Sequence, residues 1–266
     1  MVRYRFCDSE VFFVAPFTVA FITFGCTFAG ALGATFLRGK LPPDHLSDQS
    51  QSVVRLGIGL VATMTALLLG LVTAAARSTF DSQDAAVRNS AAAILTLDRH
   101  LARYGPETKP TRDLIRNVVA YRLETIWHET PSGVAEPPHD EGLPPIEQIE
   151  NQILGLEPRT DTQRWFKAEA LKLNEEVMKM RWQMLGFGGG AVPLPFLAVV
   201  IFWLTVTFSS FGLYAPRNAT VIAVLFVASI SVAAAVFLVL ELDGPFDGVI
   251  KVSSQPVRYV LRELGR

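Results

Sequence analysis

The amino-acid sequence predicts an all-α membrane protein with four transmembrane helices and a large helical domain between the second and the third. Half of the 266 residues are hydrophobic and 18% are charged, whereas roughly 25% of the residues of a soluble domain carry charge. Most of the charged residues lie between Arg77 and Arg181, so both ends of the chain are apolar. The surplus of apolar side chains therefore has to face lipid.

Four runs of the sequence contain no Asp, Glu, Lys or Arg. They are Val11 to Leu37, Leu56 to Ala76, Trp182 to Pro216 and Asn218 to Leu240. Each reaches the roughly 20 residues that a helix needs to cross the hydrocarbon core of a bilayer. We expect residues 1–76 to hold the first two spans, 77–185 the helical domain, 186–242 the last two spans, and 243–266 a C-terminal tail.

The first span is rich in small residues, which let neighbouring membrane helices approach closely. They are Gly25, Ala29, Gly30, Ala31 and Gly33. Close contact with another span is therefore expected on this helix.

Basic residues near the spans predict that both termini and the helical domain are cytoplasmic. Arg3 and Arg5 precede the first span, and four basic residues follow the fourth, namely Lys251, Arg258, Arg262 and Arg266. The connection after the third span carries only Arg217. Because basic residues accumulate on the cytoplasmic side, we expect a multi-pass protein of the plasma membrane with the lipid bilayer as its main partner. The net charge of −1 argues against nucleic acid as a partner.

The second membrane helix has no reason to stop at the membrane surface. No Gly or Pro stands between Gly70 and Gly105, while the composition changes from Leu and Ala to charged residues. We expect one helix to continue into the cytoplasm. Its charged part keeps an apolar stripe that must pack against another element, at Val87, Ala91, Ile94 and Leu101.

Two more helices are expected in the helical domain. The first runs from about Thr111 to His128, with an apolar face at Ile115, Val119, Leu123 and Ile126. The second begins near Thr160, which has capping-box spacing to Gln163. Its apolar positions alternate steps of four and three, which is typical of a coiled-coil seam: Phe166, Ala170, Leu173, Val177, Met180 and Met184. The expected partner of this seam is the extension of the second helix; a contact between subunits is the alternative.

Two segments rich in proline or glycine interrupt the helices. Pro131 to Pro145 is acidic and is expected to form a surface loop. Gly186 to Pro195 leads into the third span and is either a simple loop or a functional kink beside a watery cavity.

No arrangement of residues predicts catalysis. The sequence has no phosphate-binding Gly loop with Lys, no HExxH, no GxSxG and no CxxC. The four histidines share no metal-binding spacing, so we expect no enzyme activity, no metal and no cofactor. Glu241 and Asp243 follow the fourth span and are interpreted as a solvated helix end. The spans carry no charge at their centres, which disfavours a proton relay.

A pore remains possible, because apolar constrictions and small hydroxyls can line one without buried charge. Thr63, Leu67 and Leu71 share one face of the second helix, beside Gly70. They are candidates for the apolar neck of a pore; the alternative is that they pack against the first or fourth helix of the same chain. Four spans are too few to enclose a pore, so several copies would be needed.

Four segments resemble a known family. Glu241 to Gly248 is similar to the acidic segment with Pro-Phe-Gly that follows the last membrane helix of bestrophins, with Glu241, Asp243, Pro245, Phe246 and Gly248 as the matching positions. The run after Gly70 resembles the bestrophin pore helix. Together with Asn89–Gly105 and Gly212–Thr220, these residues resemble a bacterial bestrophin-like family and cover most of the chain.

The resemblance implies an oligomeric ion channel in a bacterial inner membrane, a pentamer that passes monovalent ions. Leu67 and Leu71 match apolar positions around a glycine of the bestrophin pore helix. The family includes anion and cation channels, and we favour the anion chloride. Pro245 and Phe246 lack the acidic run that clasps calcium in animal bestrophins, so calcium gating is not expected. The alternative function is a non-conducting scaffold or sensor whose helical stalk binds a partner.

Overall fold

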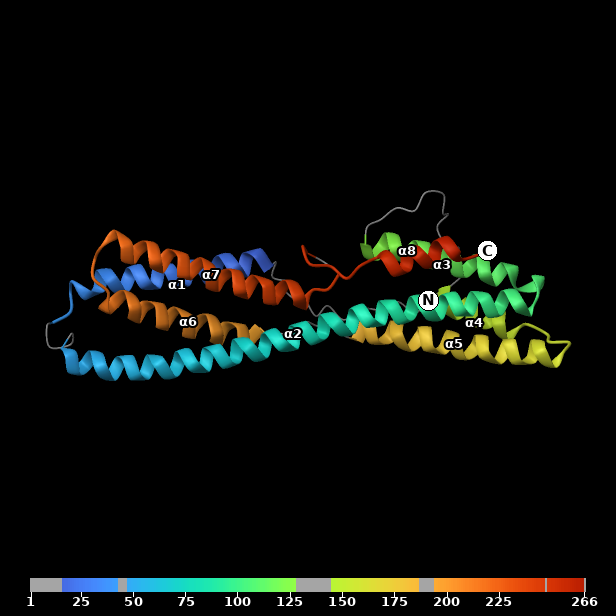
Figure 1. The fold of residues 1–266 in the computed structure, drawn as a ribbon, viewed down its shortest axis with the longest axis horizontal. Coiled ribbons are helices and arrows are strands. Elements are labelled where there is room, and N and C mark those ends of the chain that lie inside the picture. The colour runs from blue at the N-terminus through green and yellow to red at the C-terminus, as the bar shows by residue number, and fades with distance from the viewer. Residues whose placement is uncertain (1–15, 43–46, 128–144, 187–193, 247, 266) are drawn as a thin grey trace, which may run out of the picture. The chain divides into compact units, whose positions relative to one another are not determined.

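Every regular element in the described part of the chain is a helix (Figure 1). The computed structural model describes residues 16–42, 47–127, 145–186, 194–246 and 248–265. In chain order the elements are α1 (Pro16–Arg38), α2 (Asp48–Tyr104), the short 3-10 helix η2 (Pro106–Thr108), α3 (Lys109–Trp127), α4 (Pro145–Leu154), α5 (Asp161–Gly186), α6 (Leu194–Tyr214), α7 (Ala219–Asp243) and α8 (Gln255–Glu263).

The chain divides into two compact units. One consists of Met1–Thr79 and Gly189–Gly244, and the other consists of Phe80–Gly188 and Pro245–Arg266. We call them the apolar unit and the helical unit. The helix α2 contributes residues to both, so the prediction of one uninterrupted helix through this region is confirmed.

Within the described residues, four helices are long and apolar enough to span a membrane: α1, α2, α6 from Pro195, and α7. Three of the four predicted runs fall within or around these helices. The third run begins too early, because Trp182 to Gly186 belong to α5 and α6 starts at Leu194. A stretch without charge can also continue a helix of the other unit, so the absence of charge alone did not locate the start of α6. The segment 187–193 lies outside the described residues. Whether it forms a simple loop or a functional kink therefore stays a prediction.

In the apolar unit, α1 packs closely against α6. A Cβ atom added at Gly212 would overlap the backbone carbonyl of Ala31, and one added at Gly30 would lie 2.8 Å from the Ser209 hydroxyl. The Thr35 hydroxyl donates to the Gly212 carbonyl at 3.0 Å. Because the paired residue numbers increase together, the two helices run parallel. Of the small residues of α1, Gly25 and Gly33 have open space beside them, so only part of the predicted set makes this contact.

The helix α1 also packs against α7, in the antiparallel direction. Phe17 stacks on Phe237 with ring centroids 4.6 Å apart, and Phe24 and Phe28 both contact the ring of Phe226. Between the rings, Thr23 and Thr27 are fully buried on the same face of α1. Their hydroxyls donate to the carbonyls of Val19 and Thr23, each at 2.8 Å. Hydroxyls bonded in this way need no partner from a neighbouring helix.

Two arginines satisfy the carbonyl groups that remain free at one end of this bundle. Arg38 donates to the Ala215 carbonyl at 2.6 Å, and Arg217 donates to the Thr35 carbonyl at 2.8 Å. The side chain of Asn218 accepts from the Val221 amide at 2.8 Å and so caps the start of α7. Polar groups thus terminate the apolar helices where the backbone would otherwise lack hydrogen bonds.

The helical unit is built around one apolar core. Buried side chains from the C-terminal part of α2, from α3, α4, α5 and α8 form it, including Leu97, Leu101, Ile115, Ile153 and Val260. The predicted apolar faces of α2 and α3 contribute Ala91, Leu101, Ile115 and Val119 to this core, and Val87 and Leu123 are also buried, so the predicted stripes are confirmed. His128 and the loop Pro131 to Pro145, apart from the helical residue Pro145, lie outside the described residues.

A tight turn joins α2 to α3. Gly105 has φ 153°, a left-handed conformation that favours glycine. The Thr108 hydroxyl donates to the carbonyls of Leu101 and Gly105, at 2.7 and 2.8 Å. Across the turn, Arg112 donates to both carboxylate oxygens of the fully buried Asp98, at 2.7 and 3.0 Å.

The seam on α5 packs against α2, as expected. Val177 and Ala93 form a buried contact flanked by Leu173 and Ile94, and Ala170 lies in the main core. At the start of α5 the Gln163 amide donor contacts the Tyr104 carbonyl at 3.1 Å, so the two helices are antiparallel. The Gln163 backbone donates to the Thr160 hydroxyl at 3.2 Å, while its side chain accepts from the amide of Arg159 instead of Thr160.

The sequence analysis missed two short helices, α4 and α8. Ile149 and Ile153 of α4 are buried, and so are Val260 of α8 and Leu264 just after it. Both helices carry apolar residues at helical spacing, but each has only two or three turns, too short to stand out beside prolines and charges. The predicted C-terminal tail is therefore partly an element of the helical unit.

Candidate functional site

One face of α2 in the apolar unit is left uncovered. Leu67 is 68% exposed and Leu71 is 66% exposed, and Leu56 and Leu60 on the same face are also exposed. Thr63 is exposed as well. The structure thus places the three predicted neck residues together on one open stripe, and packing against α1 or α7 of the same chain is excluded for both leucines.

The opposite face of α2 is the one that packs within the apolar unit. Thr65 is 4% exposed and Ala76 is fully buried. Leu69 and Val72 line a small apolar gap together with residues of α6 and α7, among them Phe196 and Val236. At about 100° per residue, Leu67 and Thr65 point to opposite sides of the helix. One side of α2 is therefore an internal contact and the other remains available.

The uncovered stripe is neutral and its hydroxyl is already bonded. Thr63 donates to the Gly59 carbonyl at 2.8 Å. An added Cβ at Gly70 would meet nothing within 4 Å, so a second helix could approach closely there. Between Asp48 and Asp81 the charged residues of α2 are Arg55 and Arg77. The stripe can contact lipid or another chain, and it offers no acid or base.

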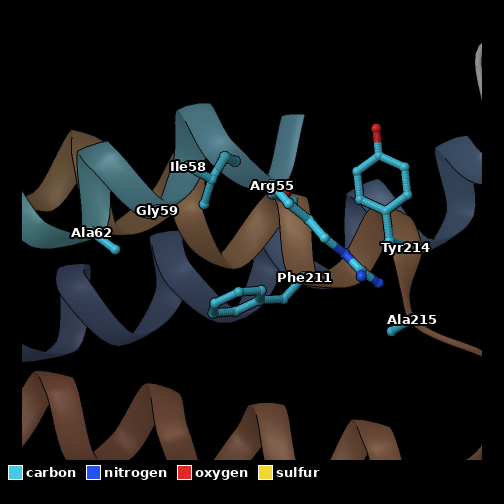
Figure 2. A pocket seen from close by; sticks show the side chains of 8 residues that line it. Arg55, Ile58, Gly59, Ala62, Phe211, Tyr214 and Ala215 are labelled. Atoms are coloured by element: carbon cyan, nitrogen blue, oxygen red, sulfur yellow. The ribbon is translucent and has the colours of Figure 1, made fainter. Parts of the chain in front are cut away.

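A pocket opens near the start of α2 (Figure 2). Arg55, Ile58, Gly59 and Ala62 of α2 line it together with Ser210, Phe211, Tyr214 and Ala215 of the α6 end. The Arg55 side chain extends from α2 toward the part of α6 that carries Phe211 and Tyr214 (Figure 2). Arg55 is the charged residue in this lining. The sequence analysis did not single it out, although a lone arginine at the edge of a long neutral run is a readable signal.

The motif at the end of α7, from Glu241 to Gly248, is divided between the two units. Glu241 is 2% exposed, so the interpretation as a solvated helix end is wrong for this residue. The carboxylate lies in the last turn of α7, where it and Asp243 both have interaction partners. These two residues belong to the apolar unit, whereas Pro245, Phe246 and Gly248 belong to the helical unit.

The Pro-Phe segment is a structural turn. Pro245 accepts a hydrogen bond from the Val252 amide at 2.8 Å, and the Val252 carbonyl accepts one from the Trp127 indole at 2.8 Å. Phe246 meets the Trp127 ring edge-on, with centroids 5.8 Å apart. Gly248 has φ 92°, which a side chain would strain. Asp247 lies outside the described residues. The described part of this motif therefore anchors the chain on α3.

Among the described residues, no group of three His, Cys, Asp or Glu side chains is arranged to hold a metal ion. The features that remain are the uncovered stripe of α2, with an arginine near its start, and a cavity in the helical unit that is treated below.

Comparison with known proteins identifies relatives for most of the chain. Residues 25–257 match the family model described as the bestrophin-like domain. A crystal structure of a bacterial bestrophin homologue from Klebsiella pneumoniae, carrying a mutation, has a similar fold with a TM-score of 0.67. The two sequences are 15% identical, and the match covers 92% of this chain and 97% of that chain. A search of curated proteins found no match.

Proposed function

Because this chain belongs to the bestrophin-like family, we propose that it assembles into an ion channel, a pentamer that conducts monovalent anions and chloride above all. The observation that carries the proposal is the uncovered stripe of α2, which is apolar, neutral and opposite to the face that packs within the chain. Copies of α2 around an axis would place this stripe on a central path.

Leu67 and Leu71 form the neck in this proposal. A ring of leucine side chains can gate ion flow by excluding water from a narrow passage. Thr63 lies one turn before Leu67 on the same face, where ions approach the neck. Gly70 allows the helices of neighbouring copies to come close at this level.

The charges of α2 favour anions. Arg55 precedes the neutral run and Arg77 follows it, and no acidic residue lies between Asp48 and Asp81. Arg55 lies on the side of α2 that faces α6, about 120° around the helix from Leu67, so it acts on the path through its charge and does not line it. Basic groups near the ends of a narrow path raise the local concentration of anions. We place the protein in a bacterial inner membrane with both termini and the helical unit in the cytoplasm, on the basis of the basic residues described above.

Planar-bilayer recording of the purified protein under separate chloride and sodium gradients tests conduction and selectivity. We expect a reversal potential that follows the chloride gradient, and Arg55→Glu should shift it toward the sodium value. A reversal potential that follows sodium in the wild type would contradict anion selectivity. No current from a protein shown by native mass spectrometry to be an intact oligomer would contradict the channel itself.

The neck has its own test. Leu67→Ala combined with Leu71→Ala should widen the constriction and raise conductance several-fold, with assembly intact. The matched control is Leu69→Ala with Val72→Ala on the opposite face of α2, which removes similar volume without facing the path. If the variant Leu67→Ala with Leu71→Ala assembles correctly and its currents are unchanged, these leucines do not line the pore.

A further inference from the structure

A cavity in the helical unit is lined by a cationic side chain for which the described residues supply no counterion. Its lining comes from α2, α3, α8 and the turn after α7, and includes Ile94, Val119, Trp127 and Phe246. The lining is apolar except for the hydroxyl of Ser90, the guanidinium of Arg122 and the indole of Trp127. Among the residues that the structure describes, no carboxylate lines it, although carboxylates are frequent elsewhere on these helices.

All of the polar groups in this lining can donate hydrogen bonds, and for two of them no described residue supplies an acceptor. The Trp127 indole already donates to the Val252 carbonyl at 2.8 Å. Within the described residues, the Arg122 side chain and the Ser90 hydroxyl make no hydrogen bond or ion pair. Two free donors that line one cavity are the arrangement that binds an anion.

The electrostatic surroundings of Arg122 agree with this assignment. Burial, together with the charge of Arg181, lowers the pKa of Arg122 to about 10. Since a lowered pKa means that the folded chain disfavours the cation, the charge destabilises the fold at every pH below that value. Buried charges in proteins are normally compensated by an opposite charge. A bound anion would supply that compensation.

The size of the cavity limits the ligand. The volume of the cavity is about 50 Å³, and a single water molecule needs about 10–15 Å³. The space holds a few water molecules, a chloride ion or a short carboxylate such as acetate. A fatty acid or a nucleotide does not fit.

We propose that Arg122 and Ser90 form a binding site for a small monovalent anion in the helical unit. The site is separate from the stripe of α2, and the proposal does not depend on conduction. It assigns a role to an arginine on an otherwise ordinary amphipathic helix.

Thermal unfolding of the full-length protein in a neutral detergent tests the site. Chloride or acetate is added in place of gluconate, which is too bulky for the cavity, at constant ionic strength. A ligand that binds only the folded state raises the Tm, and we expect a saturable rise of roughly 2–4 °C. Arg122→Met should abolish the rise, whereas the exposed Arg116→Met on the same helix should keep it.

The variant Arg122→Met is expected to fold, because it removes an uncompensated charge and keeps an unbranched chain of similar length. In gluconate it should melt no lower than the wild type. A much lower Tm in gluconate would show that a carboxylate of this chain already neutralises Arg122, and would overturn the proposal. An equal rise with chloride in the wild type and in Arg122→Met would also overturn it.

Fluorescence gives an independent measurement, because Trp127 lines the cavity. Iodide bound beside it should quench part of the tryptophan emission with saturation, above the linear quenching of exposed tryptophans. Arg122→Met should remove the saturable part, and Trp127→Phe should remove it too. A saturable part that survives Arg122→Met would place the anion at another site.

Discussion

Single buried charges in this protein are held in two different ways. Asp98 is fully buried and receives two hydrogen bonds from Arg112, whose pKa is raised chiefly because of the bond to Asp98. Arg122 has the opposite situation, with a lowered pKa and no counterion among the described residues. The ion pair of Asp98 and Arg112 stabilises the turn between α2 and α3, whereas Arg122 is the residue that we propose binds an anion.

Replacing Asp98 by Asn should destabilise the helical unit. The change removes one partner of a buried ion pair and leaves the Arg112 charge without compensation, which costs about 3 kcal/mol in the free energy of unfolding. The expected drop in Tm is roughly 6–12 °C, measured by circular dichroism. Asp113→Asn, at an exposed position on α3, is the control and should change the Tm little. Equal melting of both variants would show that the pair contributes nothing to stability.

At the scale of elements, α2 has a different role in each of the two units. One helix from Asp48 to Tyr104 supplies an uncovered apolar stripe in one unit and a core face in the other. Its partner in the helical unit is α5, whose seam buries Val177 against Ala93. The apolar contact along this seam stabilises the part of α2 that belongs to the helical unit.

Replacing Leu173 and Val177 by Asp should unfold or misassemble the helical unit. Both side chains pack on α2, and a buried carboxylate without a partner costs several kcal/mol. Lys172→Asp with Glu176→Asp places carboxylates at the adjacent exposed positions and should leave the Tm nearly unchanged. Size-exclusion chromatography and thermal melting compare the two. Wild-type behaviour of the seam variant would show that the seam is exposed.

Elements with strong periodicity were predictable and weakly patterned ones were not. The continuity of α2, the faces of α2 and α3 and the seam of α5 follow from breaker-free runs and apolar spacing. The helices α4 and α8 are too short for such a signal. The burial of Glu241 and the cavity at Arg122 depend on residues brought together from distant segments, so no local pattern records them. The stripe at Leu67 could be predicted from the sequence, but only the fold shows that none of the described residues covers it.

At the scale of the whole molecule, the proposed topology places the helical unit in the cytoplasm. The connection around Lys40 then lies outside, together with Arg38 and Arg217 at the same end of the bundle. The basic residues of the sequence support this orientation through their excess on the proposed cytoplasmic side.

Labelling of single cysteines tests the orientation. In a background with Cys7 and Cys26 changed to Ser, we expect Lys40→Cys to react with a membrane-impermeant maleimide in cells with a permeabilised outer membrane. Lys172→Cys, exposed on α5, should react only after lysis. The reverse pattern would invert the proposed topology, and labelling of both in intact cells would point to a mixed orientation.

The central claim is that the uncovered stripe of α2 lines an ion path, and block of current by a thiol reagent tests it most directly. Leu67→Cys and Leu69→Cys are compared in the same cysteine-free background, in planar bilayers with chloride as the charge carrier. Because Leu67 faces the proposed path and Leu69 faces α6 and α7, a charged methanethiosulfonate should block the Leu67→Cys current and spare the Leu69→Cys current. A Leu67→Cys current that persists after mass spectrometry shows complete modification would contradict the claim.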